Sequence, residues 1–176
     1  MNICVFSSAY NLEEPYKAAA RELGALIGKN GHALVWGGGR VGTMGVIADA
    51  AQENGAKLIG IIASHVKHQE RDGVDEMIVV ETLAERKKQL LERSDAVVVL
   101  PGGLGTLDEV TDVMEAKKHG AHTKEIVFLN VGGFYDGTKM QLDRMDVEGF
   151  LPKKLAEYVL FANTPTEVMS LIEPVT

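Results

Sequence analysis

Short, continuously apolar stretches alternate with helical segments along the whole chain, and this alternation constrains the fold more than any other feature. The clearest stretch is AVVVL at residues 96–100, in which no position is polar. Strands of this kind are buried on both faces, as in parallel sheets with helices on either side. The sequence therefore predicts the α/β class, as a doubly wound Rossmann-like parallel sheet with helices on both faces.

The expected elements follow from hydrophobic periodicity, from prolines at helix starts and from glycines after helix ends. Strands are expected at residues 2–6, 33–36, 57–62, 77–80, 96–100 and 126–130. Helices are expected at residues 15–30, 44–54, 83–93, 106–119, 138–147 and 166–172. The polar stretch 64–75 has no periodicity and is expected to be a loop. A length of 176 residues predicts a single nucleotide-binding α/β domain over 1–176, once the loops below are considered.

Charge and composition exclude several classes of protein. The net charge of −7 argues against a nucleic-acid partner, because phosphate backbones attract clustered positive charge. No apolar run approaches the ~18–20 residues of a membrane span, and no positively charged leader precedes the first apolar stretch. The only cysteine, Cys4, excludes an internal disulfide and is expected to be a buried small hydrophobe. We therefore expect a cytoplasmic protein with no nucleic-acid or membrane partner.

Two glycine-rich loops carry the first indication of function. They are GGGRVGTMG at residues 37–45 and PGGLGTLDE at residues 101–109, and each joins the end of an expected strand to a helix. Glycines let the backbone approach a ligand closely, and a helix N-terminus offers free N–H groups and partial positive charge. The loops therefore predict binding of a phosphate-bearing small molecule, although tight turns that merely pack helix against sheet would look similar.

The first loop also fits a dinucleotide fingerprint, because Gly37, Gly39 and Gly42 satisfy G-x-G-x-x-G. That fingerprint expects an acidic residue at the end of the next strand, where it holds the ribose hydroxyls. Here the strand ends in Ile-Ile-Ala-Ser at residues 61–64, without a carboxylate. A nicotinamide-dependent oxidoreductase is therefore the weaker of the rival interpretations.

Three ordered motifs resemble those of one enzyme family. PGGLGTLDE matches the signature P-G-G-x-G-T-x-x-E, GGGRVGTMG matches a second glycine signature, and ETLAERK at residues 81–87 resembles E-T-M-H-E-R-K. These are motifs of the LOG ("lonely guy") family, cytokinin-activating phosphoribohydrolases whose members often carry the label lysine decarboxylase. The resemblance extends through nearly the whole chain.

The resemblance implies hydrolysis of the N-glycosidic bond of a nucleoside 5′-monophosphate, AMP or an N6-substituted AMP, with Arg86 and Glu109 as catalytic residues. It implies at least a homodimer, with Arg86 close to the contact between subunits. The sequence itself shows no metal-ligand cluster of recognisable spacing and no segment like a pyridoxal-phosphate site, so we expect no metal and no cofactor. The second loop and its surroundings, with two glycines of the first loop and a serine after the first strand, supply the expected substrate contacts. These are Lys87, Gly102, Gly103, Leu104, Gly105, Thr106, Leu107, Asp108, Gly38, Gly39 and Ser8.

The sequence departs from the family pattern at several positions. The usual C-G-S-S after the first strand is here Ser7-Ser8-Ala9-Tyr10, the usual M-H before E-R-K is Leu83-Ala84, and a usual tryptophan is Ala116. These changes fall around the expected base pocket, so they leave the identity of the base open. Ser7 and Ser8 could each contact the substrate or only form the turn.

Simpler interpretations apply to the same residues. Thr106-x-x-Glu109 also fits a helix capping box, in which each side chain bonds a backbone N–H of the first turn. The same spacing occurs at Thr82-x-x-Glu85, Thr138-x-x-Gln141 and Thr164-x-x-Glu167. A non-catalytic nucleotide-binding or carrier protein is therefore the main alternative to an enzyme.

Overall fold

The strands form one parallel sheet. The computed structural model describes residues 1–173, in which seven strands pair in the order β4-β3-β2-β1-β5-β6-β7, every neighbouring pair being parallel. The strands are β1 (Asn2–Phe6), β2 (Ala33–Trp36), β3 (Leu58–Ala63), β4 (Glu76–Val80), β5 (Ala96–Val99), β6 (Ile126–Leu129) and β7 (Leu160–Ala162). The expected α/β class and parallel sheet are confirmed.

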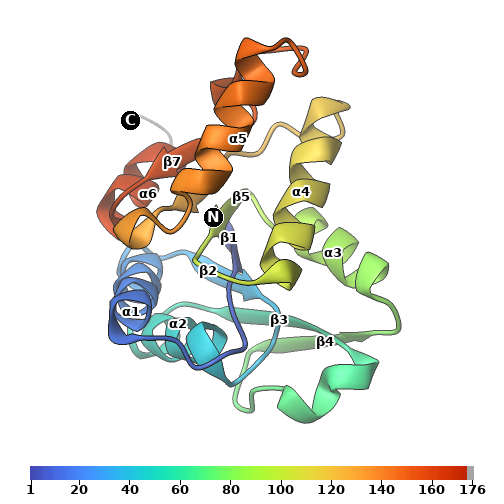
Figure 1. Cartoon of the computed structure of the whole chain (residues 1–176). Helices are drawn as coiled ribbons and strands as arrows, with labels where there is room; N and C mark the ends of the chain where they lie inside the picture. The colour runs from blue at the N-terminus through green and yellow to red at the C-terminus, as the bar shows by residue number, and fades with distance from the viewer. Residues whose placement is uncertain (174–176) are drawn as a thin grey trace.

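Helices cover both faces of this sheet (Figure 1). They are α1 (Glu14–Lys29), α2 (Gly42–Glu53), α3 (Leu83–Glu92), α4 (Leu104–Lys118), α5 (Asp136–Val147) and α6 (Pro165–Ile172), with short 3₁₀ turns η1 (Ser64–Gln69), η2 (Val131–Gly133) and η3 (Leu155–Glu157). Their order along the chain alternates with the strands almost throughout, which is the doubly wound arrangement.

Alternate side chains of the central strand, β1, belong to two separate hydrophobic clusters, one on each face of the sheet. In β1, Ile3 and Val5 join a cluster with buried side chains of α1, α2 and α6, whereas Cys4 and Phe6 join a second cluster with α3 and α4. All four side chains are at most 2% exposed. The expectation that Cys4 is a buried small hydrophobe is confirmed. A strand that buries both faces needs apolar residues at every position, which explains the continuously apolar pattern.

Several elements differ from the sequence-based expectation, and α2 and α5 each begin two residues earlier than expected. Residues 64–69 of the expected loop form η1, because a short 3₁₀ turn requires no hydrophobic periodicity. Strand β7 was not predicted, since three residues are too few to show an alternation. Helix α4 begins at Leu104, two residues before the expected start, because Gly103 is the last residue with extended backbone angles.

The sheet order places a crevice at a defined point. The order runs from β1 to β4 in one direction and from β5 to β7 in the other, so β1 and β5 flank the point at which it reverses. In open α/β sheets, ligands bind outside the carboxyl ends of the strands at this point. Among the helices of the described residues, none has both the length and the apolar character that crossing a membrane requires.

Candidate active site

A cavity of about 420 Å³ lies at the switch point, at the carboxyl ends of β1 and β5. Its lining combines residues that follow β1, the start of α4 and single side chains of α2 and α3. Of the predicted site residues, it brings together Ser8, Arg86, Gly103, Leu104, Gly105, Thr106 and Glu109. The remaining ones, Lys87, Gly102, Leu107, Asp108, Gly38 and Gly39, do not line it.

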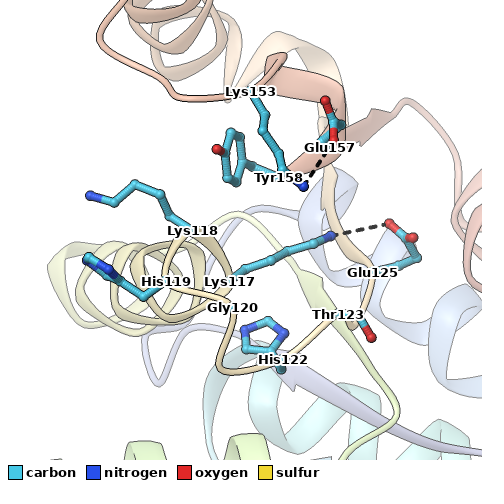
Figure 2. Close-up of a pocket in the computed structure, with 10 residues that line it drawn as sticks. All are labelled: Lys117, Lys118, His119, Gly120, His122, Thr123, Glu125, Lys153, Glu157 and Tyr158. Atoms are coloured by element: carbon cyan, nitrogen blue, oxygen red, sulfur yellow. Dashed lines mark ion pairs between the residues drawn. The ribbon is translucent and has the colours of Figure 1, made fainter.

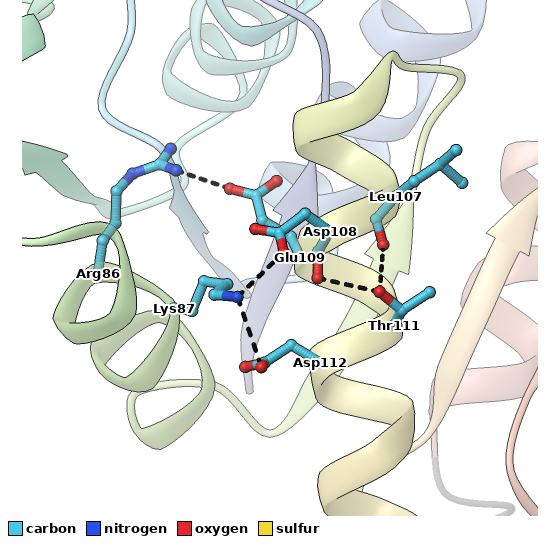
Figure 3. A network of polar contacts seen from close by, with 7 residues as sticks. All are labelled: Arg86, Lys87, Leu107, Asp108, Glu109, Thr111 and Asp112. Carbon is cyan, nitrogen blue, oxygen red and sulfur yellow. Dashed lines mark hydrogen bonds and ion pairs between the residues drawn. The ribbon is translucent and has the colours of Figure 1, made fainter.

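The two expected catalytic residues form an ion pair inside this cavity (Figure 3). Arg86 Nη1 donates to Glu109 Oε1 at 2.7 Å, and Arg86 Nε donates to the carbonyl oxygen of Ile61 at 3.0 Å. The Arg86 and Glu109 side chains are only 15% and 11% exposed. Arg86, which lies on α3, is therefore anchored to β3, and its fork of donors orients the carboxylate of Glu109 on α4.

Burial raises the pKa of the Glu109 carboxyl above its ordinary value, and the Arg86 guanidinium opposes this shift without cancelling it. The carboxylate has lost most of its hydration and regains only one charge-assisted hydrogen bond. A buried carboxylate of raised pKa is a stronger base than an exposed glutamate and suits proton abstraction near neutral pH.

The start of α4 faces the same cavity with unused hydrogen-bond donors. Within residues 1–173, the backbone N–H groups of Leu104, Gly105 and Thr106 donate no hydrogen bond, and no side chain caps the helix at Gly103. Such N–H groups, together with the helix dipole, form an anion-binding site. Glu109 lies about one turn further along the helix, so an anion held here would place its adjoining atoms next to the carboxylate.

The glycines of the second loop differ in their surroundings. A Cβ at Gly103 or Gly105 would meet no atom within 4 Å, so these positions are open toward the cavity. A Cβ at Gly102 would lie 2.1 Å from Thr106 Oγ1, so this glycine lets the buried threonine side chain pack beneath the loop. Gly102 thus shapes the loop rather than lining the cavity.

The other predicted residues of this region lie beside the cavity. Lys87 Nζ pairs with Asp108 at 3.2 Å and with Asp112 at 3.4 Å, which ties α3 to α4 (Figure 3). Leu107 packs against the hydrophobic core on the α3–α4 face. In this structure their contacts hold the two helices that carry Arg86 and Glu109.

The glycines of the first loop pack closely against the protein and do not line the cavity. A Cβ at Gly37 would lie 2.1 Å from Arg86 Nη2, and one at Gly39 would lie 3.0 Å from the end of Met44. Gly38, with φ of +73°, packs against Met77 and Ile62. These glycines make room for neighbouring side chains, above all for the guanidinium of Arg86.

Ser8 closes the turn between β1 and the first glycine loop. Its hydroxyl accepts a hydrogen bond from the backbone N–H of Tyr10 at 3.0 Å, and its N–H donates to Thr43 Oγ1 at 3.0 Å. Its carbonyl oxygen accepts from the N–H of Met44 at 3.2 Å, so Ser8 covers the start of α2. Although Ser8 lines the cavity, its N–H, carbonyl oxygen and hydroxyl oxygen each take part in a hydrogen bond of the turn.

The capping-box interpretation is confirmed in two places and wrong in two others. Thr82 and Thr164 each accept a hydrogen bond from the backbone N–H three residues later, at 3.1 and 3.2 Å. Thr106 and Thr138 lie inside α4 and α5, not at their N-caps, so neither forms the box. The Glu109 carboxylate bonds Arg86 instead of a backbone N–H.

Sequence reasoning assigned no substrate contact to three lining residues, Ala9, Tyr10 and Met44, and did not foresee the role of Gly37. Tyr10 lies at the cavity with its side chain 76% exposed. Its position after the central strand at the switch point was the available signal, because residues there face the ligand crevice. No pattern in the sequence indicates that Gly37 accommodates Arg86, since the two are 49 positions apart.

A second cavity, of about 490 Å³, lies at the opposite end of α4 (Figure 2). Both of its carboxylates are paired with lysines of the same cavity, Glu125 with Lys117 at 3.6 Å and Glu157 with Lys153 at 3.4 Å. It contains neither a glycine-rich loop nor a helix N-terminus. The first cavity is therefore the better candidate for chemistry.

The chain is similar over most of its length to proteins that are already known. The family model described as "Possible lysine decarboxylase" matches residues 44–172. The cytokinin riboside 5′-monophosphate phosphoribohydrolase of Mycobacterium marinum is 33% identical over 98% of this chain and 93% of its own length. The enzyme LOG of Oryza sativa subsp. japonica is 36% identical over 97% of this chain and 72% of its own length.

Among solved structures, the Moco carrier protein of Chlamydomonas reinhardtii is 25% identical, with a TM-score of 0.73 over 97% of this chain and 94% of that one. The family model covers well over half of the chain, and the curated relatives exceed 30% identity over nearly all of it. The chain therefore belongs to the LOG family, the family of the cytokinin riboside 5′-monophosphate phosphoribohydrolases.

Proposed function

We propose that the protein hydrolyses the N-glycosidic bond of a nucleoside 5′-monophosphate, releasing a free base and ribose 5-phosphate, with AMP or an N6-substituted AMP as substrate. One observation carries the proposal: the buried carboxylate of Glu109 and the unused N–H groups at the start of α4 line the same cavity. Relatives named as phosphoribohydrolases support it.

The reaction requires stabilisation of positive charge on the sugar. When the bond between C1′ and the base nitrogen breaks, its electron pair leaves with the base and positive charge develops on the ribose. The Glu109 carboxylate stabilises that charge and accepts a proton from the water whose oxygen bonds to C1′. The departing base takes up a proton from solvent water and Glu109 returns its proton to solvent, so one water is consumed overall and the products are neutral base and ribose 5-phosphate.

Binding of the phosphate group positions the substrate in the cavity. The N–H groups of Leu104, Gly105 and Thr106 bind the phosphate at the start of α4. Arg86 remains protonated and cannot act as a base, but it orients Glu109 and offers further donors to the substrate.

A non-catalytic carrier is the second candidate, and a specific similarity favours it. The Moco carrier protein of Chlamydomonas reinhardtii shares the fold at 25% identity. Binding alone would need the anion site but no buried carboxylate. Incubation with a panel of nucleoside monophosphates, with free base followed by chromatography, separates the two candidates: the enzyme releases base, whereas a carrier binds without turnover.

Glu109→Gln tests the catalytic role directly. Glutamine retains the shape and can still accept the Arg86 hydrogen bond, so the fold should remain intact. The lost charge should lower kcat by on the order of 10²–10⁴-fold. Because burial raises the pKa of Glu109, the acidic limb of the wild-type kcat/KM profile should lie above the ordinary glutamate value of about 4.3.

Glu167→Gln is the matched control. Glu167 accepts a hydrogen bond from the N–H of Asn163 at 2.7 Å in the capping box of α6, away from the cavity. Glutamine can accept the same bond, so turnover should stay unchanged. A Glu109→Gln protein with wild-type melting temperature and at least half the wild-type turnover would exclude the catalytic assignment.

The family resemblance also supports a homodimer, and we include this assembly in the proposal. A mass of 19.0 kDa in light scattering at micromolar concentration, that of one chain, would contradict it.

A further inference from the structure

The two serines after β1 differ in their hydrogen bonding. The Ser8 hydroxyl accepts from the N–H of Tyr10 and is thereby part of the turn. The Ser7 hydroxyl is closed to solvent, and no hydrogen-bond partner for it exists within residues 1–173. Both residues line the candidate active site, so the chain carries one engaged and one unengaged hydroxyl at the same wall.

An unengaged buried hydroxyl is an unusual feature of a folded protein. Burying a hydroxyl without a hydrogen bond costs free energy, and nearly all buried polar atoms have a partner. Alanine at position 7 would avoid this cost with almost the same volume. A buried serine hydroxyl without a partner among residues 1–173, at the wall of a cavity, therefore indicates that a ligand supplies the partner.

The position of Ser7 indicates which part of the ligand this is. Ser7 follows the last residue of the central strand and shares the cavity with Arg86 and Glu109. The phosphate has its own donors at the start of α4. A serine hydroxyl both donates and accepts, and rotation about its single side-chain torsion reaches three staggered positions. It therefore matches a neutral hydrogen-bonding group, such as a ribose hydroxyl or the edge of a base.

We propose that Ser7 is a specificity-determining residue whose hydroxyl turns into the cavity and bonds the nucleoside half of the substrate. This inference rests on the proposed function, because it takes the ligand to be a nucleoside 5′-monophosphate. It also reverses the expectation that Ser8 provides the contact, since the Ser8 hydroxyl is already engaged.

Ser7→Ala and Ser8→Ala should differ in their effect on the melting temperature. Ser7→Ala removes no hydrogen bond of the empty protein, so the melting temperature should stay the same or rise. The loss of one neutral hydrogen bond should weaken AMP binding in calorimetry, and lower kcat/KM, by about three- to tenfold. Ser8→Ala removes the acceptor for the Tyr10 N–H and should lower the melting temperature.

Two substrate arms identify the group that Ser7 contacts. If Ser7 bonds the 2′-hydroxyl, Ser7→Ala should weaken AMP binding but leave 2′-deoxy-AMP binding unchanged. If it bonds the base edge, both nucleotides should lose affinity equally, whereas IMP should show a different ratio. Ser170→Ala, at an exposed serine of α6, is the control for serine truncation and should change neither affinity nor turnover.

The outcome that overturns the inference differs from the one that overturns the function. Equal affinity of Ser7→Ala and wild type for every nucleotide would overturn the role of Ser7, whatever the turnover. Binding of AMP by the wild type without release of base would overturn the hydrolase, while a selective loss of affinity in Ser7→Ala would still support the contact.

Discussion

The two glycine-rich loops look alike in sequence but differ in what faces each missing side chain. In the first loop a Cβ at Gly37 would meet Arg86 Nη2 at 2.1 Å, and one at Gly42 would meet backbone carbonyl oxygens at 2.5 Å. In the second loop a Cβ at Gly103 or Gly105 would meet nothing within 4 Å. The first loop uses glycine to pack protein against protein, whereas the second leaves space at a helix N-terminus.

The helix starts differ in the same way. The third N–H of α2, that of Met44, bonds the carbonyl oxygen of Ser8, and the carbonyl oxygens of Ser8 and Tyr10 lie close to Gly42, so residues 8–10 lie across that helix start. The corresponding N–H of α4, that of Thr106, has no protein partner among the described residues, and the Cβ position of Gly105 is open. A glycine-rich turn before a helix is therefore an anion site only where the chain leaves the helix start uncovered.

Gly42→Ala should have the largest effect, on stability. Gly42 has φ of +63°, where an L-residue is strained, and its Cβ would lie 2.5 Å from the carbonyl oxygens of Ser8 and Tyr10. Because backbone atoms cannot move aside cheaply, we expect a loss of at least about 3 kcal/mol, or roughly 6–12 °C in melting temperature. Thermal unfolding measures this, and a shift below 2 °C would refute the packing role.

Gly37→Ala should affect activity more than stability. The atom that its Cβ would meet is the far end of the Arg86 side chain, which can move away. The guanidinium would then leave Glu109, and misplacement of about 1 Å can cost 10²-fold in rate. We expect roughly a 10²-fold loss of kcat/KM with a smaller fall in melting temperature than for Gly42→Ala. Wild-type kcat/KM of the Gly37→Ala variant in steady-state kinetics would contradict this expectation.

Gly105→Ala should give the smallest change, with stability and activity moving in opposite directions. Gly105 is the second residue of α4, and alanine is favoured over glycine in helices by up to about 1 kcal/mol. The added methyl would occupy the space in which a phosphate approaches the N–H groups, so kcat/KM should fall by at least about tenfold.

Gly137→Ala is the matched control for Gly105→Ala. Gly137 is the second residue of α5, also has no atom within 4 Å of its Cβ position, and does not line the cavity. It should give the same small gain in melting temperature without a change in kcat/KM. Equal activity of the two variants would mean that the space at Gly105 serves no ligand.

Much of the fold could be predicted from the sequence, because burial on both faces leaves a pattern in local residues. The AVVVL stretch became β5, and the capping boxes at Thr82 and Thr164 formed as their spacing indicates. The box at Thr106 failed because the helix start depends on the backbone angles of Gly103, which the spacing does not encode.

The site was predictable where a motif marks it and unpredictable where contacts join distant positions. Arg86 and Glu109 were both expected as catalytic residues and are in contact, while their catalytic roles stay a prediction. Which of two adjacent serines has a free hydroxyl depends on where the Tyr10 N–H points, so no sequence pattern could decide it.

The packing of Arg86 beneath Gly37 restricts the order in which this site can change over evolutionary time. Any side chain at position 37 would occupy the space of the guanidinium, so substitutions there become tolerable only after residue 86 has been shortened. A chain that keeps the arginine is thereby held to glycine at position 37, although the two residues come from different elements. The effects of Gly37→Ala and Arg86→Ala should therefore be strongly non-additive, each masking much of the other.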